Sequence, residues 1–349
     1  MAHLYAWNHT GVSSQHAYYE NHFPYDIIRD WCNSENPDRQ LYCLKSGKVI
    51  VDRYHTSHTT NEMRAAVLRS GIDRIDIGSK TGPQGETISQ KLAFDLDSND
   101  YEMVYPGDGA TVEEDGLITE GAWAMIALSL GYLGLYLDKI YGLTPRPAYR
   151  YIFSGRRGAH LWLDGYDRDD TNLRDVKTLS SDFLPLLKKA DAACEAQRLL
   201  SNPEHGLDDW LAQVGDYART SLADACIWNR SPQTTTYLEQ ELTAIFSEPI
   251  EPRNEFFKAR VETIEEEVWQ AAGLLLIAPR HDVNVTVGKG HLLKSPFSLH
   301  HETQLISIPF DPFDMKNCVR DNVCVPVHEL VQGKHPVADI FQQSIMLFD

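Results

Sequence analysis

The stretch KLAFDLDSNDYEMV, residues 91–104, places two aspartates at the end of a short apolar run. Its first half is typical of a strand, in which residues i and i+2 share a face, so Asp95 and Asp97 should point the same way while Leu96 faces the core. Two carboxylates on one face repel each other unless a divalent cation lies between them or one stays protonated. The alternative is a plain strand end, because the Ser-Asn-Asp that follows is typical of a turn.

The composition is that of a globular protein with an uneven charge. The chain has 349 residues, 42% of them hydrophobic, which is enough for one large core or two joined ones. The formal net charge is -18; residues 93–120 contain nine acids and no Lys or Arg, whereas residues 146–157 contain four arginines and no acid. The acidity argues against a nonspecific nucleic-acid coat protein, but an enzyme with a local basic groove is compatible with it.

The cysteines and the apolar runs indicate where such a chain works. Its six cysteines form no C-x-x-C pair, and MAHLYAWNHTG at the start lacks a basic region followed by an apolar core. We therefore expect free thiols and an intracellular location. The uncharged run at 121–137 has 17 residues with Ser and Gly among them, which predicts a buried helix rather than a membrane span of about 20 residues.

The periodicity of the remaining chain predicts an α/β (α+β) fold, with helices flanking mixed β-sheets. A helical pattern at 14–32 is interrupted by Pro24. We expect a catalytic core made of residues 1–169 and 266–349, and a mostly helical insertion at 170–265. The expected strands are the hairpin 41–54 and the segments 74–78, 91–97, 149–155, 159–165, 282–288 and 305–310.

The segment SGRRGAH, residues 154–160, lies between two expected strands. Its glycines allow the backbone to approach a ligand, while the guanidinium groups of Arg156 and Arg157 project from the turn. Ser154 and His160 add a hydroxyl and a titratable donor, a combination that suits a triphosphate. An ordinary hairpin with surface arginines is the alternative.

A third segment, PRHDVNVTVGKGHLLKSPFSLH at 279–300, supplies an acid and two possible phosphate ligands. Asp282 opens the expected strand, where it is either a metal ligand or a strand-capping acid. Lys294 and His300 could both reach a phosphate. Because G-x-x-x-x-G-K-[ST] is absent, VGKG is not a P-loop. Together with Asp95 and Asp97, these residues would suit nucleotidyl transfer with two divalent metals.

The chain resembles the catalytic small subunit of archaeal and eukaryotic DNA primase. The similar segments follow the family's order over most of the length, although nothing in 170–265 matches. The matches are YYENHFPY (18–25), DRYHTS (52–57), RIDIG (74–78), FDLD (94–97), SGRRGAH (154–160), HLLKSPFSLH (291–300) and ISIPFD (306–311).

The resemblance implies a role for each matching residue. Catalytic metal ligands would be Asp95, Asp97 and Asp282, holding two Mg²⁺ or Mn²⁺ ions. The nucleoside triphosphate would be bound by Ser154, Arg156, Arg157, His160, Lys294 and His300, with Arg53, Asp76 and Arg280 around the nucleotide. The implied activity is template-directed synthesis of short RNA primers on single-stranded DNA, wherever the genome is copied.

The resemblance also implies partners and shows one departure. A large subunit would complete a heterodimer, and a replicative polymerase or a helicase are further candidate partners; no membrane contact is expected. The family usually has a zinc-binding cluster after its D-x-D strand, but residues 105–123 contain neither Cys nor His, so we expect no zinc. Alternatives are a primase–polymerase for DNA extension or repair, a two-metal nuclease, and a structural subunit without activity.

Overall fold

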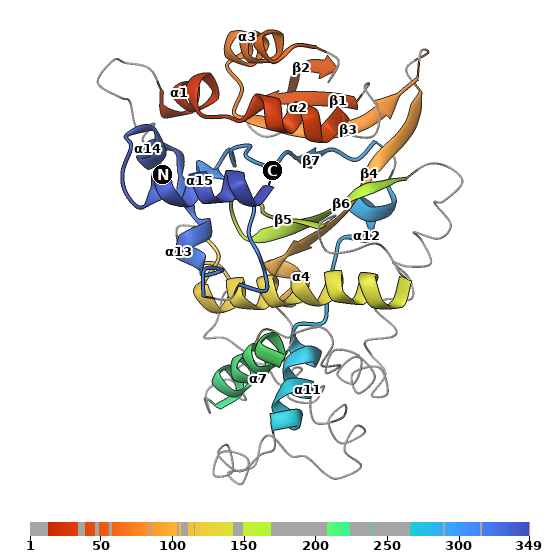
Figure 1. Ribbon diagram of the computed structural model, residues 1–349, viewed down its shortest axis with the longest axis vertical. Coiled ribbons are helices and arrows are strands. Elements are labelled where there is room, and N and C mark those ends of the chain that lie inside the picture. Colours follow the sequence, from red (N-terminus) through yellow and green to blue (C-terminus); the bar gives the residue numbers. More distant parts are fainter. Residues whose placement is uncertain are drawn as a thin grey trace.

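The computed structural model describes residues 13–33, 39–45, 49–55, 58–82, 84, 86–102, 105, 111–114, 116–141, 149–168, 208–223, 240, 266–288, 290–314 and 316–348. Strands and helices combine in an α+β fold, as the sequence predicts. Helices α1 (Ser14–Asn21), α2 (Tyr25–Asn33) and α3 (Thr60–Ser70) lie at one end of the molecule, and α7 (Asp208–Ala223) and α11 (Glu266–Leu276) lie at the other (Figure 1).

The main sheet has the strand order β2-β1-β3-β4-β6-β5, with β7 on β3, and every pairing in it is antiparallel. The expected hairpin at 41–54 and the expected strands at 74–78, 91–97, 149–155 and 159–165 all form and belong to this sheet. Their bounds are β1 Arg39–Lys45, β2 Val49–His55, β3 Arg74–Thr81, β4 Thr87–Asp97, β5 Tyr149–Phe153, β6 Gly158–Arg168 and β7 Leu293–Lys294.

Strand β4 joins two halves of this sheet. Its first residues pair with the end of β3, where Thr87 lies opposite Thr81, and its last residues pair with β6, where Asp97 lies opposite Gly158. The first half of β3 is paired instead with β7. Residues at the end of β4 therefore face the place where the β3–β7 half and the β5–β6 half meet.

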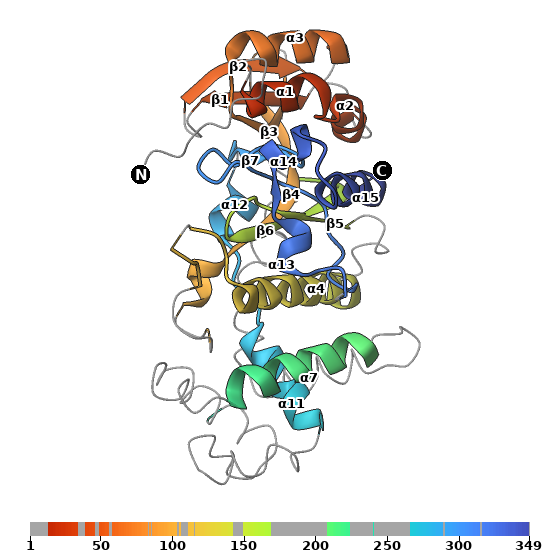
Figure 2. The ribbon, with the colours of Figure 1, turned by 90° about the vertical axis from the view of Figure 1, so that its left-hand side faces the viewer.

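The hydrophobic helix α4 (Glu120–Tyr141) packs under the β5–β6 half (Figure 1). Between Ala122 and Leu137, the apolar side chains whose burial is described are buried, apart from the half-buried Ala124, as expected for a core helix. Gly134 allows close packing, because a methyl group there would lie 2.1 Å from the Tyr151 hydroxyl oxygen. No helix in the described part of the chain is long and apolar enough to cross a membrane. In the turned view, α4 separates the sheet from α7 and α11 (Figure 2).

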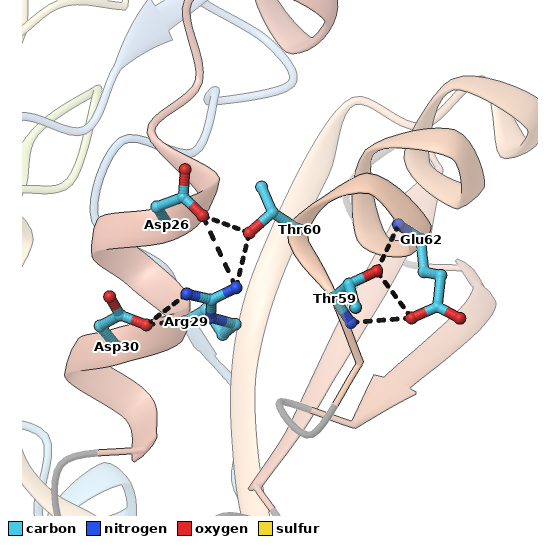
Figure 3. A network of polar contacts seen from close by, with 6 residues as sticks. All are labelled: Asp26, Arg29, Asp30, Thr59, Thr60 and Glu62. Carbon is cyan, nitrogen blue, oxygen red and sulfur yellow. Dashed lines mark hydrogen bonds and ion pairs between the residues drawn. The ribbon is translucent and has the colours of Figure 1, made fainter.

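The N-terminal helices are fixed by aromatic residues and by caps. The break between α1 and α2 falls at Pro24, as predicted. The Tyr18 hydroxyl donates to the Phe297 carbonyl over 2.6 Å, which fixes α1 against the segment after β7. Figure 3 shows how α2 is joined to α3: Arg29 Nη1 donates to Thr60 Oγ1 over 2.8 Å, beside the capping box of Thr59 and Glu62.

One strand prediction is wrong and another is confirmed only in part. Residues 283–287 form the short helix α12 (Val283–Val287), because the Asp282 carboxylate accepts a hydrogen bond from the Asn284 backbone N–H over 2.8 Å and caps a helix there. The expected strand 305–310 is regular only at β8 (Leu305–Ile306), which pairs with β9 (Val325–Pro326). Beyond β8 the chain runs along β5 irregularly, and Pro309 has no N–H to donate.

Helix α13 (Arg320–Val323) precedes β9, and helices α14 (Val327–Val331) and α15 (Val337–Phe348) follow it. The predicted division into a core and a helical insertion at 170–265 stays a prediction. Within that range the structure describes α7 and residue 240, and the other residues lie outside the described part. Helix α7 packs closely on α11, since a methyl group at Gly273 would lie 2.4 Å from the Val214 carbonyl oxygen.

Candidate functional site

The end of β4 presents two carboxylates on one face, as the sequence predicts. Leu96 between them is fully buried in the core, whereas the side chains of Asp95 and Asp97 are 29% and 35% exposed. Asp95 lies directly opposite His160 of β6, and Asp95 Oδ1 is 3.6 Å from His160 Nε2. Register thus places the first carboxylate and the last residue of the SGRRGAH segment side by side.

Asp282 arrives at the same place from a distant part of the chain. Its backbone N–H donates to the Asp95 carbonyl over 2.9 Å, and the preceding residue bridges to Leu96. Burial first, and then the negative charges of Asp97 and Asp282, raise the pKa of Asp95 to about 7. The structure therefore brings the three predicted acids together, in a mutually repelling group.

These acids are not a preassembled metal site. Among the residues that the structure describes, no three His, Cys, Asp or Glu side chains are arranged to hold a metal ion. Asp97 accepts from Arg157 Nε over 2.9 Å and from the Asn99 backbone N–H over 3.0 Å, while Asp282 caps α12. The donor set still fits Mg²⁺ or Mn²⁺ in kind, because these cations prefer carboxylate oxygens and a cation would relieve the repulsion that raises the Asp95 pKa.

Residues 154–157 of the SGRRGAH segment form the turn between β5 and β6, as expected, and its last three residues begin β6. Gly155 has a φ of +86°, which favours glycine, and a methyl group at Gly158 would lie 2.3 Å from the Leu96 carbonyl oxygen. The two glycines therefore let the turn press against the end of β4. Arg157 contacts Asp97 over 2.9 Å and Arg156 contacts Glu302 over 2.5 Å, so the two guanidinium groups have different carboxylate partners.

Lys294 connects the two halves of the sheet. It lies on β7 opposite Asp76 of β3, and its ammonium donates to the Ser154 carbonyl in the β5–β6 turn. Burial, followed by the charge of Arg74, lowers the pKa of Lys294, and Asp76 and Asp95 oppose that shift. An arriving anion would favour the charged form of this lysine, because a nearby opposite charge raises the pKa of an amine.

Two buried histidines lie against the turn. Burial is the main cause that lowers the pKa of His160 and of His300, followed for both by the charge of Lys294. Both imidazoles are therefore neutral at pH 7. Within the described residues, His160 Nδ1 is buried without a hydrogen-bond partner, whereas His300 Nδ1 accepts from the Glu302 backbone N–H over 3.3 Å.

The three outer candidates are Asp76, Arg53 and Arg280, and each has a partner of its own. Asp76 is buried and paired with Arg74, whose Nη2 donates to it over 2.9 Å. Arg53 belongs to the same cross-strand row as Asp76 and Lys294, but Tyr42 lies between, and the Arg53 guanidinium stacks 5.5 Å from the Tyr42 ring centroid.

Arg280 lies beside the 3-10 helix η1 (Ser98–Tyr101), which directly follows β4. Its backbone N–H donates to the Tyr101 hydroxyl over 2.8 Å, and its guanidinium stacks 5.9 Å from that ring centroid. Burial, followed by the charges of two neighbouring aspartates, raises the pKa of Asp100, and the charge of Arg280 opposes that shift.

Sequence reasoning missed Arg74, Asp100 and Glu302. Arg74 begins the RIDIG segment and Asp100 follows the D-x-D strand, so their positions beside predicted residues were the available signal. No pattern in the sequence pointed to Glu302, because its contact with Arg156 forms only when the 300–305 turn packs against the SGRRGAH turn.

Comparisons with known proteins place the chain among relatives of one kind. Residues 94–312 match the family "DNA primase small subunit". The DNA primase small subunit of Saccharomyces cerevisiae is 23% identical, over 87% of this chain and 82% of the yeast protein. Those of Caenorhabditis elegans and Drosophila melanogaster are 21% and 23% identical, over 87% and 84% of this chain and 84% and 75% of their own lengths.

Proposed function

Because the chain belongs to the DNA primase small subunit family, we propose that it synthesises short RNA primers from nucleoside triphosphates on a single-stranded DNA template. One observation carries the proposal: three carboxylates from β4 and the start of α12 meet the two-arginine turn and a buried lysine. This arrangement supports the proposal, because nucleotidyl transfer needs metal ligands next to phosphate ligands.

In this proposal Asp95, Asp97 and Asp282 hold two Mg²⁺ or Mn²⁺ ions. When bound, the cations acidify the attacking 3′-hydroxyl and stabilise the leaving pyrophosphate, so that no protein base is required. The carboxylate of Asp95 must lose the proton that burial favours before it can act as a ligand. Arg157 holds Asp97 at the end of β4, so in this proposal it links a metal ligand to the phosphate-binding turn.

The triphosphate is bound in this proposal by Ser154, Arg156, Arg157, His160, Lys294 and His300. The arginines supply forked donors, and Lys294 is a buried point charge that an anion would keep protonated. His160 can donate from Nε2 or Nδ1, and its Nδ1 has no partner of its own among the described residues. Asp76, Arg53 and Arg280 surround the nucleotide further out.

The activity requires partners that are also proposals. Single-stranded DNA is the template, and the name of the family implies a primase large subunit that completes a heterodimer. A replicative polymerase or a helicase would receive or deliver the primed template. The site of action would be wherever the genome is copied.

The test is primer synthesis on single-stranded DNA with labelled nucleoside triphosphates and Mg²⁺ or Mn²⁺, with and without a large subunit. The double variant Asp95→Asn/Asp97→Asn keeps the shape of both side chains and should make no product. Its control is Asp30→Asn/Asp321→Asn, which removes the same charge from two exposed acids that pair with a neighbouring arginine.

Three outcomes would contradict the proposal. Equal product from the parent chain and the Asp95/Asp97 variant would place the chemistry elsewhere. Extension with deoxynucleotides alone would indicate a primase–polymerase. Degradation of a labelled template without added nucleotides would indicate a nuclease, a class of enzyme that has little use for the arginine turn and Lys294.

A further inference from the structure

Glu302 contacts a residue proposed to bind phosphate but has no place among the proposed ligands. Its carboxylate lies 2.5 Å from Arg156 Nη1, and the two side chains are 50% and 31% exposed respectively. A carboxylate here takes the position that a phosphate oxygen would take on the same guanidinium, because both anions bind the arginine fork in the same way.

The backbone, rather than chance side-chain contact, holds Glu302 in this position. It lies in a tight turn in which the Gln304 backbone N–H donates to the His300 carbonyl over 2.9 Å and Gln304 has a φ of +58°. Thr303 Oγ1 donates to the Gly155 carbonyl over 2.6 Å, and this bond joins the turn directly to the SGRRGAH segment. The 300–305 turn therefore delivers Glu302 to Arg156.

Arg156 is only partly satisfied by this pairing. Its Nε is buried and has no hydrogen-bond partner within the described part of the chain. Its backbone carbonyl accepts from Ile118 N–H over 3.1 Å, which fixes the backbone while the guanidinium Nε stays without an acceptor. A buried N–H without a partner is costly, so a shift of the guanidinium that brought a further acceptor to this atom would be favourable.

We propose that Glu302 is an intramolecular competitor for Arg156 that sets how tightly the site holds a triphosphate. The inference rests on the proposed function. Triphosphate binding must displace the Glu302 carboxylate from Arg156, and pyrophosphate release is assisted when the carboxylate returns. Glu302 is thus a positioning residue, since it acts on the nucleotide through Arg156.

The variant Glu302→Gln tests this, because glutamine keeps the length of the side chain and removes its charge. With a chelator present to remove divalent metals, calorimetry should show that inorganic triphosphate binds the variant about three- to tenfold more tightly, the range expected for losing a half-exposed ion pair and a like charge nearby. The gain should shrink as salt is added, because salt screens exposed charges.

The chain offers a closely matched control. Asp216 and Arg219 of α7 form an ion pair of the same length, 2.5 Å, with side chains that are 57% and 33% exposed. Asp216→Asn removes the same charge from the same kind of pair in another part of the fold, so it should leave triphosphate affinity unchanged. In the Arg156→Gln background, Glu302→Gln should lose most of its effect.

In primer synthesis, Glu302→Gln should lower the KM for nucleoside triphosphate, leave kcat equal or lower, and make pyrophosphate a stronger inhibitor. If Glu302→Gln binds triphosphate no better than Asp216→Asn while Arg156→Gln binds it worse, the competitor role is wrong and the proposed nucleotide site stands. If the parent chain and Arg156→Gln bind triphosphate equally or not at all, the proposed nucleotide site fails, and the competitor role fails with it.

Discussion

Asp95 should make the protein less stable wherever its carboxyl is ionised and no cation is bound. Its side chain is 29% exposed, and burial with two neighbouring acids raises its pKa from 3.8 to about 7. Each pH unit between those values corresponds to about 1.36 kcal/mol, so the ionised carboxylate costs the folded state about 4 kcal/mol. We expect Asp95→Asn to remove this cost and so to increase the free energy of unfolding.

The sign of the pH dependence follows from which state binds the proton. Between pH 3.8 and about 7 the folded chain holds a proton on Asp95 that the unfolded chain has lost. This group's contribution to stability therefore falls as pH rises through that window. The gain from Asp95→Asn should be about 4 kcal/mol at pH 8 and about 2 kcal/mol at pH 5, since less of the penalty has developed at the lower pH.

Urea unfolding in chelator at both pH values, followed by circular dichroism, measures the two gains. Groups that titrate identically in the parent and the variant cancel in the difference. Asp216→Asn is the control, because it removes an exposed carboxylate paired with Arg219 in a different part of the fold. Adding Mg²⁺ should then stabilise the parent chain and leave Asp95→Asn unchanged, because a ligand stabilises the state that binds it.

A gain that is equal at pH 8 and pH 5 would refute the electrostatic reasoning, since it would point to a packing effect. A loss of stability at pH 8 would show that the carboxylate has favourable partners that outweigh its burial. Mg²⁺ stabilising both proteins equally would place the cation away from Asp95.

Two other predictions separate structure from function. Asp282→Asn should keep the cap of α12 and the stability while abolishing primer synthesis, whereas Asp282→Ala should also lose about 1 kcal/mol in urea unfolding, because alanine cannot accept the Asn284 N–H; equal stability of the two variants would contradict the cap. Gly134→Ala should cost about 1–3 kcal/mol by overpacking α4 against Tyr151, and adding Tyr151→Phe should restore part of that loss; no rescue in thermal unfolding would show that the clash is elsewhere.

Local patterns in the sequence were sufficient for much of the site. Alternation along β4 placed Leu96 in the core and the two aspartates on the other face, since side-chain direction in a strand follows from the backbone alone. The glycines of the SGRRGAH segment predicted a tight turn because its conformation excludes most other residues there. The roles of these residues remain proposals, although the structure brings their side chains together.

Other features depended on contacts that no local pattern encodes. The alternating valines after Asp282 favour a strand, yet the aspartate caps a helix, and its backbone bond to Asp95 fixes where that helix begins. The strand expected at 305–310 also depends on distant partners, because the chain leaves β9 after Ile306 and bonds to β5 from Ile308 onward.

The sequence by itself determined most of the elements, the family and the chemical types gathered at the candidate site, because these depend on periodicity and on residue identity. Only the tertiary structure decided that β4 passes from one half of the sheet to the other, that Lys294 bridges the halves, and that Glu302 rests on Arg156. The physical reason is that the strength of a charge, and whether a side chain has a partner, depend on burial and on neighbours far away in the chain.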